Sequence, residues 1–193
     1  MTAAVSIPST PAEVTAGWLS QILGATVDTV QTAPIGTGQT GATYRVSVTY
    51  RDDAGLPGTF AVKLPSQDET VRDRVTIGYR SEHAFYTNVA DHVQIPTPHC
   101  HHCEIAGEGA DFVLVLADMA PAEQGDQIAG CTPAEARLAV LALADLHGPT
   151  WSDPQWANFP GIAMPNRSPT RPRDSGTSPR WPPTSRWTRS VHD

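Results

Sequence analysis

Lysine is nearly absent from this sequence: among 193 residues it occurs once, as Lys63. Cysteine is also scarce, and three cysteines without a secretory signal fit a reducing cytoplasm better than a disulfide framework. The first ten residues contain no basic side chain and no long apolar run, so we expect no signal peptide. No stretch approaches the roughly 18 apolar residues that a membrane-spanning helix needs. We therefore expect a soluble, cytoplasmic protein.

The charge is distributed unevenly. The formal net charge of -7 argues against a nucleic-acid partner. Residues 1–166 hold 7 Lys+Arg against 18 Asp+Glu, whereas residues 167–193 hold 6 Arg and 2 Asp. This last segment is rich in Pro, Ser and Thr and lacks Leu, Ile, Phe and Ala, so we expect it to be a disordered basic tail. Two interpretations of the tail stay open, a docking segment and an out-of-frame translation product, and composition favours the second.

Three helix starts share the capping-box pattern, in which a hydroxyl residue precedes a glutamate by three positions. They are Thr10–Glu13, Ser66–Glu69 and Thr132–Glu135. The first helix is predicted to run to Leu23, the second from Gln67 to about His92 with a possible break near Gly78, and the third over 133–147. One face of the first helix is apolar: Val14, Trp18, Leu19, Ile22. The third helix is apolar all round, so we expect it to be buried.

Four segments have the composition of strands. Residues 43–50 alternate with period two, the turn residues at 52–55 follow, and residues 59–64 return as the second arm of a hairpin. Residues 27–35 and 112–116 are further strands, the latter apolar and expected inside a sheet. Hairpins with a helix inserted between strands predict an α+β lobe, with an antiparallel sheet plus a helix.

Gly36, Gly38 and Gly41 fit the pattern G-x-G-x-x-G. In a dinucleotide-binding fold a helix would begin at these glycines, but the residues that follow alternate as a strand. A Walker loop needs Lys and Ser/Thr after the last glycine, and Ala42-Thr43 stand there instead. The remaining functional interpretation is a strand–loop–strand hairpin over nucleotide phosphates; a merely flexible turn is the alternative.

Lys63 favours the phosphate interpretation. It lies within an apolar strand, where a lysine is costly to bury unless it is paired. In kinases such a lysine meets the α- and β-phosphates and is oriented by a glutamate of the following helix, and Glu82 is suitably placed for that role. The alternatives are an edge-strand lysine that discourages aggregation and a solvated glutamate on a helix surface.

Five segments occur here in the order found in aminoglycoside phosphotransferase-like and ecdysteroid kinase-like enzymes, which the sequence resembles over about residues 11–160. The segments are Gly36–Gly41, Ala61–Lys63, Glu82–Tyr86, Val113–Met119 and Leu143–His147. The resemblance implies a protein-kinase-like fold with ATP between two lobes. It places a nucleotide-binding lobe over 1–119 and the hinge exit with the first helix or helices of the second lobe over 120–166. The implied nucleotide-binding residues are Gly36, Thr37, Gly38, Gln39, Gly41, Lys63, Glu82 and the hinge residues Ala117, Asp118 and Met119.

The same resemblance shows what the chain does not contain. These kinases carry a His-Gly-Asp loop with a following Asn, and then a second Asp that binds Mg²⁺. After His147 the only aspartates are Asp153, Asp174 and Asp193, none in that context, and Pro149 follows Gly148 where the loop would need Asp. We therefore expect a truncated, inactive phosphotransferase with no catalytic or metal-binding residue.

Such a chain would bind ATP weakly, and Mg²⁺ only if the missing lobe were supplied. In full-length relatives the acceptor is a small-molecule hydroxyl; no nucleic-acid or membrane partner is expected. The alternative is a non-enzymatic binding or regulatory module that uses the acidic lobe or the basic tail as its interaction surface.

The segment His99–Cys103 resembles a metal cluster in composition, with two cysteines and three histidines. On a regular strand, Cys100 and His102 would face away from His101 and Cys103, and no second ligand pair follows at zinc-finger spacing. We therefore expect a strand without a metal.

Overall fold

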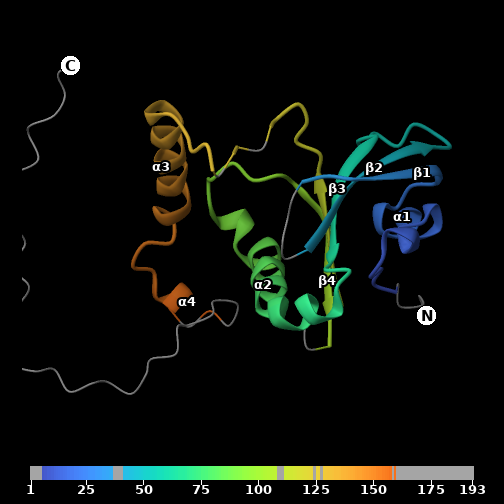
Figure 1. The fold of residues 1–193 in the computed structure, drawn as a ribbon, viewed down its shortest axis with the longest axis horizontal. Coiled ribbons are helices and arrows are strands. Elements are labelled where there is room, and N and C mark those ends of the chain that lie inside the picture. The colour runs from blue at the N-terminus through green and yellow to red at the C-terminus, as the bar shows by residue number, and fades with distance from the viewer. Residues whose placement is uncertain are drawn as a thin grey trace, which may run out of the picture. The chain divides into compact units, whose positions relative to one another are not determined.

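The computed structural model describes residues 6–36, 41–107, 111–123, 125–126, 128–157 and 159. The chain divides into two units, Met1–Ala163 and Met164–Asp193, and every described residue belongs to the first. The expected disordered tail (residues 167–193) therefore lies outside the described residues. The elements (Figure 1) are two 3-10 helices η1 (Pro11–Glu13) and η2 (Ala90–His92), helices α1 (Ala16–Leu23), α2 (Glu69–Asn88), α3 (Pro133–His147) and α4 (Pro154–Ala157), and strands β1 (Val27–Pro34), β2 (Gly41–Tyr50), β3 (Thr59–Pro65), β4 (Cys100–Ala106) and β5 (Asp111–Ala117).

The five strands form one antiparallel sheet in the order β1-β2-β3-β5-β4. Strands were predicted at all five places, and their observed bounds differ from the predicted ones by a few residues at most. The expected α+β class is confirmed at the level of a mixed α/β protein with an antiparallel sheet. The likeness to a kinase lobe stays a prediction.

One face of the sheet packs against α1. Alternate residues of β2 and β3 point to this side, so Val46, Phe60 and Val62 are completely buried there. Helix α1 contributes Trp18 and Leu19 to the same cluster, as the apolar face predicted for it requires. Full burial of such a side chain contributes roughly 1.5–3 kcal/mol, so this layer supplies most of the hydrophobic stabilisation of the sheet.

Helix α2 covers the opposite face (Figure 1), where a second core cluster forms around Tyr79, Phe112 and Leu114. The rings of Tyr79 and Phe112 stack with centroids 5.0 Å apart. The Tyr79 hydroxyl also accepts a hydrogen bond from the buried backbone N–H of Ser66 at 2.9 Å. Tyr79 thereby fixes the middle of α2 to both the sheet and the end of β3.

The first predicted helix is interrupted. Thr10 and Glu13 meet as the capping box predicts, since the Glu13 carboxylate accepts from the Thr10 backbone N–H at 3.0 Å. That cap, however, starts only the short η1 (Pro11–Glu13), and α1 begins after a new N-cap, Thr15. The prediction of one continuous helix was wrong because Thr15 offers its hydroxyl to the Trp18 N–H and so favours a fresh start.

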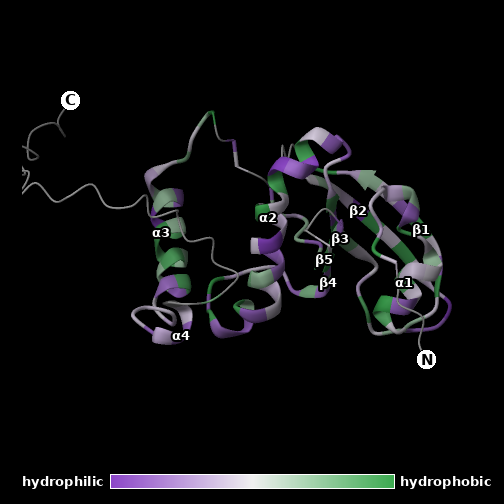
Figure 2. Ribbon diagram, turned by 90° about the horizontal axis from the view of Figure 1, so that it is seen from below, coloured by the Kyte–Doolittle hydropathy of each residue, from purple (hydrophilic) through white to green (hydrophobic). Residues whose placement is uncertain are grey.

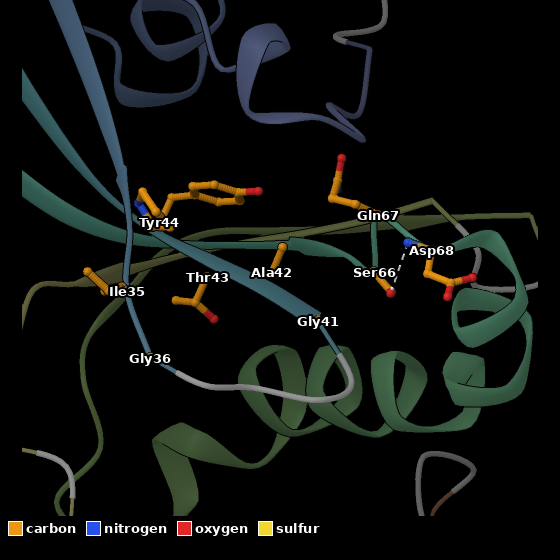
Figure 3. Close-up of a pocket in the computed structure, with 10 residues that line it drawn as sticks. Ile35, Gly36, Gly41, Ala42, Thr43, Tyr44, Ser66, Gln67 and Asp68 are labelled. Atoms are coloured by element: carbon orange, nitrogen blue, oxygen red, sulfur yellow. Dashed lines mark hydrogen bonds between the residues drawn. The ribbon is translucent and has the colours of Figure 1, made fainter.

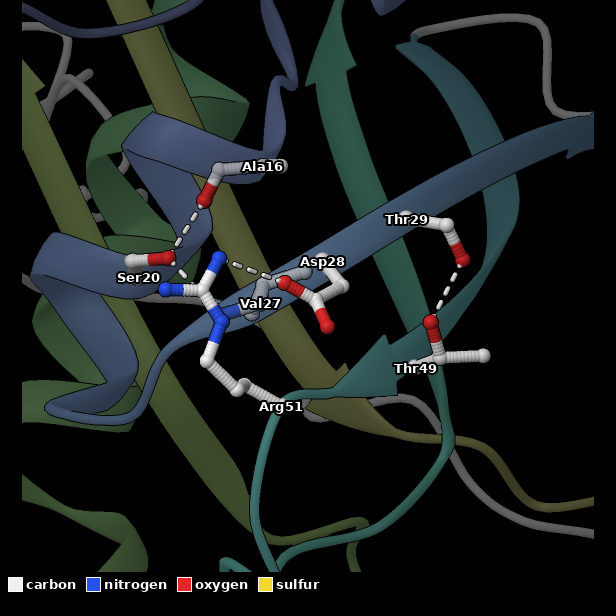
Figure 4. Close-up of polar contacts among 7 residues, drawn as sticks. All are labelled: Ala16, Ser20, Val27, Asp28, Thr29, Thr49 and Arg51. Carbon is white, nitrogen blue, oxygen red and sulfur yellow. Dashed lines mark hydrogen bonds and ion pairs between the residues drawn. The ribbon is translucent and has the colours of Figure 1, made fainter.

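Ser20 joins α1 to the sheet (Figure 4). Its hydroxyl donates to the carbonyl of Ala16 at 2.7 Å and accepts from the backbone N–H of Val27 at 2.9 Å. The same view shows the surface ion pair between Arg51 and Asp28, at 3.0 Å, on the neighbouring strands. This corner is therefore held by a network that does not involve the glycine motif.

The predicted cap of the second helix was displaced by two residues. Asp68, not Ser66, is the N-cap of α2, since its carboxylate accepts from the Thr70 N–H at 2.9 Å. The Ser66 hydroxyl instead accepts from the Asp68 N–H at 3.2 Å and shapes the turn before the helix. The helix continues through Gly78 without the break considered for that position.

Helix α3 begins as predicted, with Thr132 and Glu135 in a capping box. The expectation that it is buried was wrong: Leu138 is 67% exposed and Leu141 is 50% exposed. Figure 2 shows apolar residues along the helix. Within the described part of the chain no element covers these side chains, and the backbone bond from Gln94 N–H to the Asp145 carbonyl lies at the end of the helix. No described helix is both long and apolar enough to cross a bilayer.

Replacement of Tyr79 by Phe tests the link between α2 and β3. The substitution keeps the ring but leaves the buried Ser66 N–H without its acceptor, so we expect the free energy of unfolding to fall by about 1–3 kcal/mol. Urea denaturation followed by circular dichroism measures the change. Tyr50→Phe is the matched control, because the Tyr50 hydroxyl bonds to the Pro57 carbonyl at an exposed site; its effect should stay within about 0.5 kcal/mol. Equal effects of the two substitutions would contradict this role of Tyr79.

Candidate functional site

The glycine motif connects β1 to β2. Gly36 follows β1 with a φ of 73°, a conformation that favours glycine, and Gly41 is the first residue of β2. The Ile35 N–H donates to the Thr43 carbonyl at 2.8 Å and closes the hairpin below the loop. The structure therefore has the strand–loop–strand context that distinguishes this motif from a dinucleotide fingerprint. The other predicted loop residues, Thr37, Gly38 and Gln39, lie outside the described residues.

A hollow of about 450 Å³ lies beside the described ends of this loop. Its walls are the end of β1, the start of β2 and the turn that precedes α2 (Figure 3). Asp68 is the only lining residue whose side chain is charged. The lining residues are Pro34, Ile35, Gly36, Gly41, Ala42, Thr43, Tyr44, Ser66, Gln67 and Asp68. Because Asp68 is acidic, the side chains of the described lining residues supply no positive charge.

Lys63 supplies a positive charge beside this motif. Its stem passes directly beside Gly41, where an added Cβ would lie 2.9 Å from Lys63 Cε and 3.2 Å from the Leu64 carbonyl oxygen. Real Cβ atoms essentially never come within 3.0 Å of another atom, so a side chain at residue 41 would displace the flexible end of Lys63 from this position. The last glycine of the motif and the only lysine of the chain are therefore direct neighbours in the structure.

The Lys63 ammonium forms an ion pair with the Glu82 carboxylate. Their side chains are 20% and 35% exposed, so the pair is partly screened from water. Tyr79 lies one helical turn before Glu82, and its burial against the sheet turns Glu82 toward β3. An ammonium has three N–H donors, so Lys63 can hold an anionic oxygen while it remains bound to Glu82. The predicted pairing of these two residues is thus present, and its role in nucleotide binding remains a prediction.

The predicted hinge begins at the end of β5. The Ala117 N–H donates to the His99 carbonyl at 2.8 Å, and the Met119 carbonyl accepts from the Ala122 N–H at 2.8 Å. The Met119 side chain is 55% exposed. Between these residues Asp118 bonds to Arg45 of β2, with Oδ2 2.7 Å from Nε and Oδ1 3.2 Å from Nη2. The hinge is therefore fixed to the sheet by a side-chain pair.

The Lys63–Glu82 and Arg45–Asp118 pairs both involve the same part of the sheet. In the strand register Lys63 lies opposite Leu114, and Phe60 lies opposite Ala117, next to the hinge. Three residues of a strand span roughly 10 Å. Ala61, which is opposite Leu116, occupies the same face between the two ends. On this face of the sheet, the small apolar side chain of Ala61 thus lies between the Lys63 ammonium at one end and the predicted hinge at the other.

Arg45 is the partner that sequence reasoning missed. The sequence places Arg45 on the face of β2 opposite Tyr44 and Val46. Nothing in the sequence indicates which carboxylate Arg45 meets. The hydrogen bond from Arg45, above all other causes, lowers the pKa of Asp118 below its ordinary value. The Asp118 side chain is only 7% exposed, while Arg45 is 42% exposed.

The histidine- and cysteine-rich segment lies on β4, away from Lys63 in sequence and at the edge of the sheet. Among the described residues, no group of three or more His, Cys, Asp or Glu side chains is arranged to hold a metal ion. The prediction that Cys100 and Cys103 face opposite sides of this strand was wrong. A β-bulge between Cys100 and His102 brings Cys100 and Cys103 to the same face of the strand.

The Arg45–Asp118 pair makes a pH-dependent contribution to stability. A lowered folded-state pKa means that this contribution is complete above the unfolded-state value, near pH 4, and is lost as the pH falls through the lower folded value. In Arg45→Gln we expect the Asp118 pKa to rise toward its ordinary value, as measured by NMR titration of the side-chain carboxyl carbon. Arg51→Gln, which breaks the surface pair with Asp28, is the control and should leave Asp118 unchanged. An unchanged Asp118 pKa in Arg45→Gln would contradict the assignment.

Comparison with known proteins gives no family for this chain. No protein-family model matches the sequence, and no curated protein matches it either. The resemblance to phosphotransferases consequently depends on the ordered segments of the sequence and on the contacts described above. What is established is a mixed α/β protein with a five-stranded antiparallel sheet, in which the only lysine is paired with Glu82 beside a glycine hairpin.

Proposed function

We propose that the chain binds ATP through a nucleotide-binding lobe of the small-molecule phosphotransferase kind. The contact between Lys63 and Glu82 is the observation that carries the proposal. It joins a strand lysine to a glutamate of the next helix, which is the arrangement that orients a phosphate-binding lysine in kinases. In this proposal Lys63 holds the α- and β-phosphates, and the glycine loop covers them with its backbone N–H groups.

The charge of the site supports this assignment. Glu82 neutralises the charge of Lys63, and the pair is only partly exposed to solvent. A phosphate that approaches the remaining ammonium donors forms charge-assisted hydrogen bonds, which are the stronger class in proteins. The acidic side chain of Asp68 lies in the neighbouring hollow and opposes the phosphates, so we expect the affinity for ATP to be weak.

Adenine is proposed to lie at the other end of the same face. Ala61 has a small side chain on this face, and the backbone around Asp118 is held in place by Arg45. A hinge fixed in this way offers backbone groups to the base at little entropic cost. Gly36, Gly41 and the loop residues 37–39 would then surround the phosphates.

The proposal is confined to binding. Phosphoryl transfer needs a residue that positions the acceptor hydroxyl and carboxylates that hold Mg²⁺, and the sequence has no counterpart of the His-Gly-Asp loop. We propose that the residues present here bind the nucleotide and do not themselves catalyse phosphoryl transfer. In this view α3 would begin the second lobe, and its exposed leucines are the kind of surface that the rest of such a lobe covers.

A calorimetric titration with ATP, with and without Mg²⁺, tests the proposal. We expect weak binding to the wild-type chain and a loss of about tenfold or more in affinity for Lys63→Ala, since a hydrogen bond to a charged group contributes about 1.5–3 kcal/mol. Arg51→Ala is the matched control, because it removes one positive charge and breaks one ion pair on the surface. No affinity in the wild type, or equal losses in the two variants, would contradict the proposal.

A further inference from the structure

The two cysteines of β4 lie at the wall of a second hollow, of about 470 Å³. The other wall is the C-terminal end of α2 together with η2, including Tyr86 and Asp91. Neither cysteine is completely buried, and both contact the cluster of Tyr79, Phe112 and Leu114 on the α2 side of the sheet. The two thiols are therefore on the same face and accessible from one cavity.

The bulge makes this arrangement possible. Cys100 lies opposite Leu116 of β5 and Cys103 lies opposite Leu114, so three steps along β4 match only two along β5. His101 and His102 turn to the other face, where they contact the rings of Phe60 and Trp18. Without the bulge, positions three apart would lie on opposite faces and roughly 10 Å apart.

The bulge also brings the two backbone positions within reach of a covalent bridge. Two ladder steps correspond to roughly 6.6 Å, which falls at the upper end of the Cα separations that disulfides span. Both side chains also pack against the same cluster on the α2 side of the sheet. Closing the bridge therefore needs only a small movement of an edge strand, since β4 has a single neighbour in the sheet.

We propose that Cys100 and Cys103 form a redox-active dithiol, which exchanges with small-molecule disulfides and closes reversibly into an internal disulfide bridge. This proposal does not depend on nucleotide binding, although Glu82 lies near Cys103. Its co-substrate is a low-molecular-weight disulfide of the glutathione class.

The exchange is balanced in two steps. The Cys100 thiolate attacks one sulfur of the external disulfide, forming a mixed disulfide and releasing one small thiol, which takes up the proton that Cys100 lost. The Cys103 sulfur then attacks the Cys100 sulfur and releases the second small thiol with the proton from Cys103. The two protein thiols are oxidised by two electrons, and the external disulfide is reduced to two thiols.

The neighbours of the two thiols support this order of attack. The hydrogen bond from Cys103, with help from the His102 backbone N–H, lowers the pKa of Cys100 below its ordinary value. The pKa of Cys103 is raised, first by its hydrogen bond with Cys100 and then by burial and by the nearby Glu82 carboxylate. Cys100 is thus the more readily ionised thiol of the two, and the ionised form is the nucleophile.

Glutathione disulfide added to the reduced full-length chain, followed by peptide mapping in a mass spectrometer, tests the proposal. We expect the peptide containing Cys100 and Cys103 to lose two hydrogen atoms without gaining glutathione. The exposed Cys131 is not part of the proposed bridge, so it should gain one glutathione, which makes it an internal control. In Cys103→Ser the second step is blocked, so Cys100 should retain a stable glutathione adduct. Cys131→Ser should leave the bridge unaffected.

Three results would overturn the proposal. They are glutathione adducts on both Cys100 and Cys103 of the wild-type chain, no reaction at either residue while Cys131 is modified, and a bridge that links Cys131 to one of them. The wild-type peptide map decides between these outcomes even if Cys103→Ser fails to fold. Repeating the reaction in urea tests the contribution of the bulge. Once the strand is lost, the rate of bridge formation, divided by the rate of Cys131 modification, should fall at least tenfold.

Discussion

The alternation of side chains along β3 is the constraint on which the structure depends. Phe60, Val62 and Leu64 are completely buried against α1, so the intervening residues must face the other way, toward α2. Lys63 is thereby committed to the α2 side, where Glu82 is the carboxylate that meets it. A one-residue shift in register would place the lysine in the hydrophobic core, which is a cost that no surrounding contact offsets.

The sequence was sufficient wherever a local rule determines the structure. The alternating pattern at 43–50 and 59–64 predicts both arms of the central hairpin, because one buried face fixes the period. A lysine inside an apolar strand needs a partner, and its place before the next helix indicates Glu82, which is the residue that Lys63 meets. The capping box at Thr132 likewise predicts the start of α3.

The sequence was insufficient where the outcome depends on distant or competing contacts. The link from Arg45 to Asp118 joins residues far apart in the chain, and the burial of α3 depends on what covers it. Thr15 caps a second helix that the sequence analysis did not separate from the first, and Asp68 replaces Ser66 as the cap of α2. The bulge at His101 breaks the period of two, and only the observed register shows that Cys100 and Cys103 share a face.

The central claim is that the Lys63 ammonium, oriented by Glu82, receives the phosphates of a nucleotide. Because the chain has a single lysine, isotope labelling of lysine gives one side-chain signal in an NMR spectrum. The most direct measurement is therefore the response of that signal to ATP and to adenosine, which lacks phosphates. The account predicts a shift that saturates with ATP and is absent with adenosine. A signal that ATP leaves unmoved, or that adenosine moves equally, would contradict it.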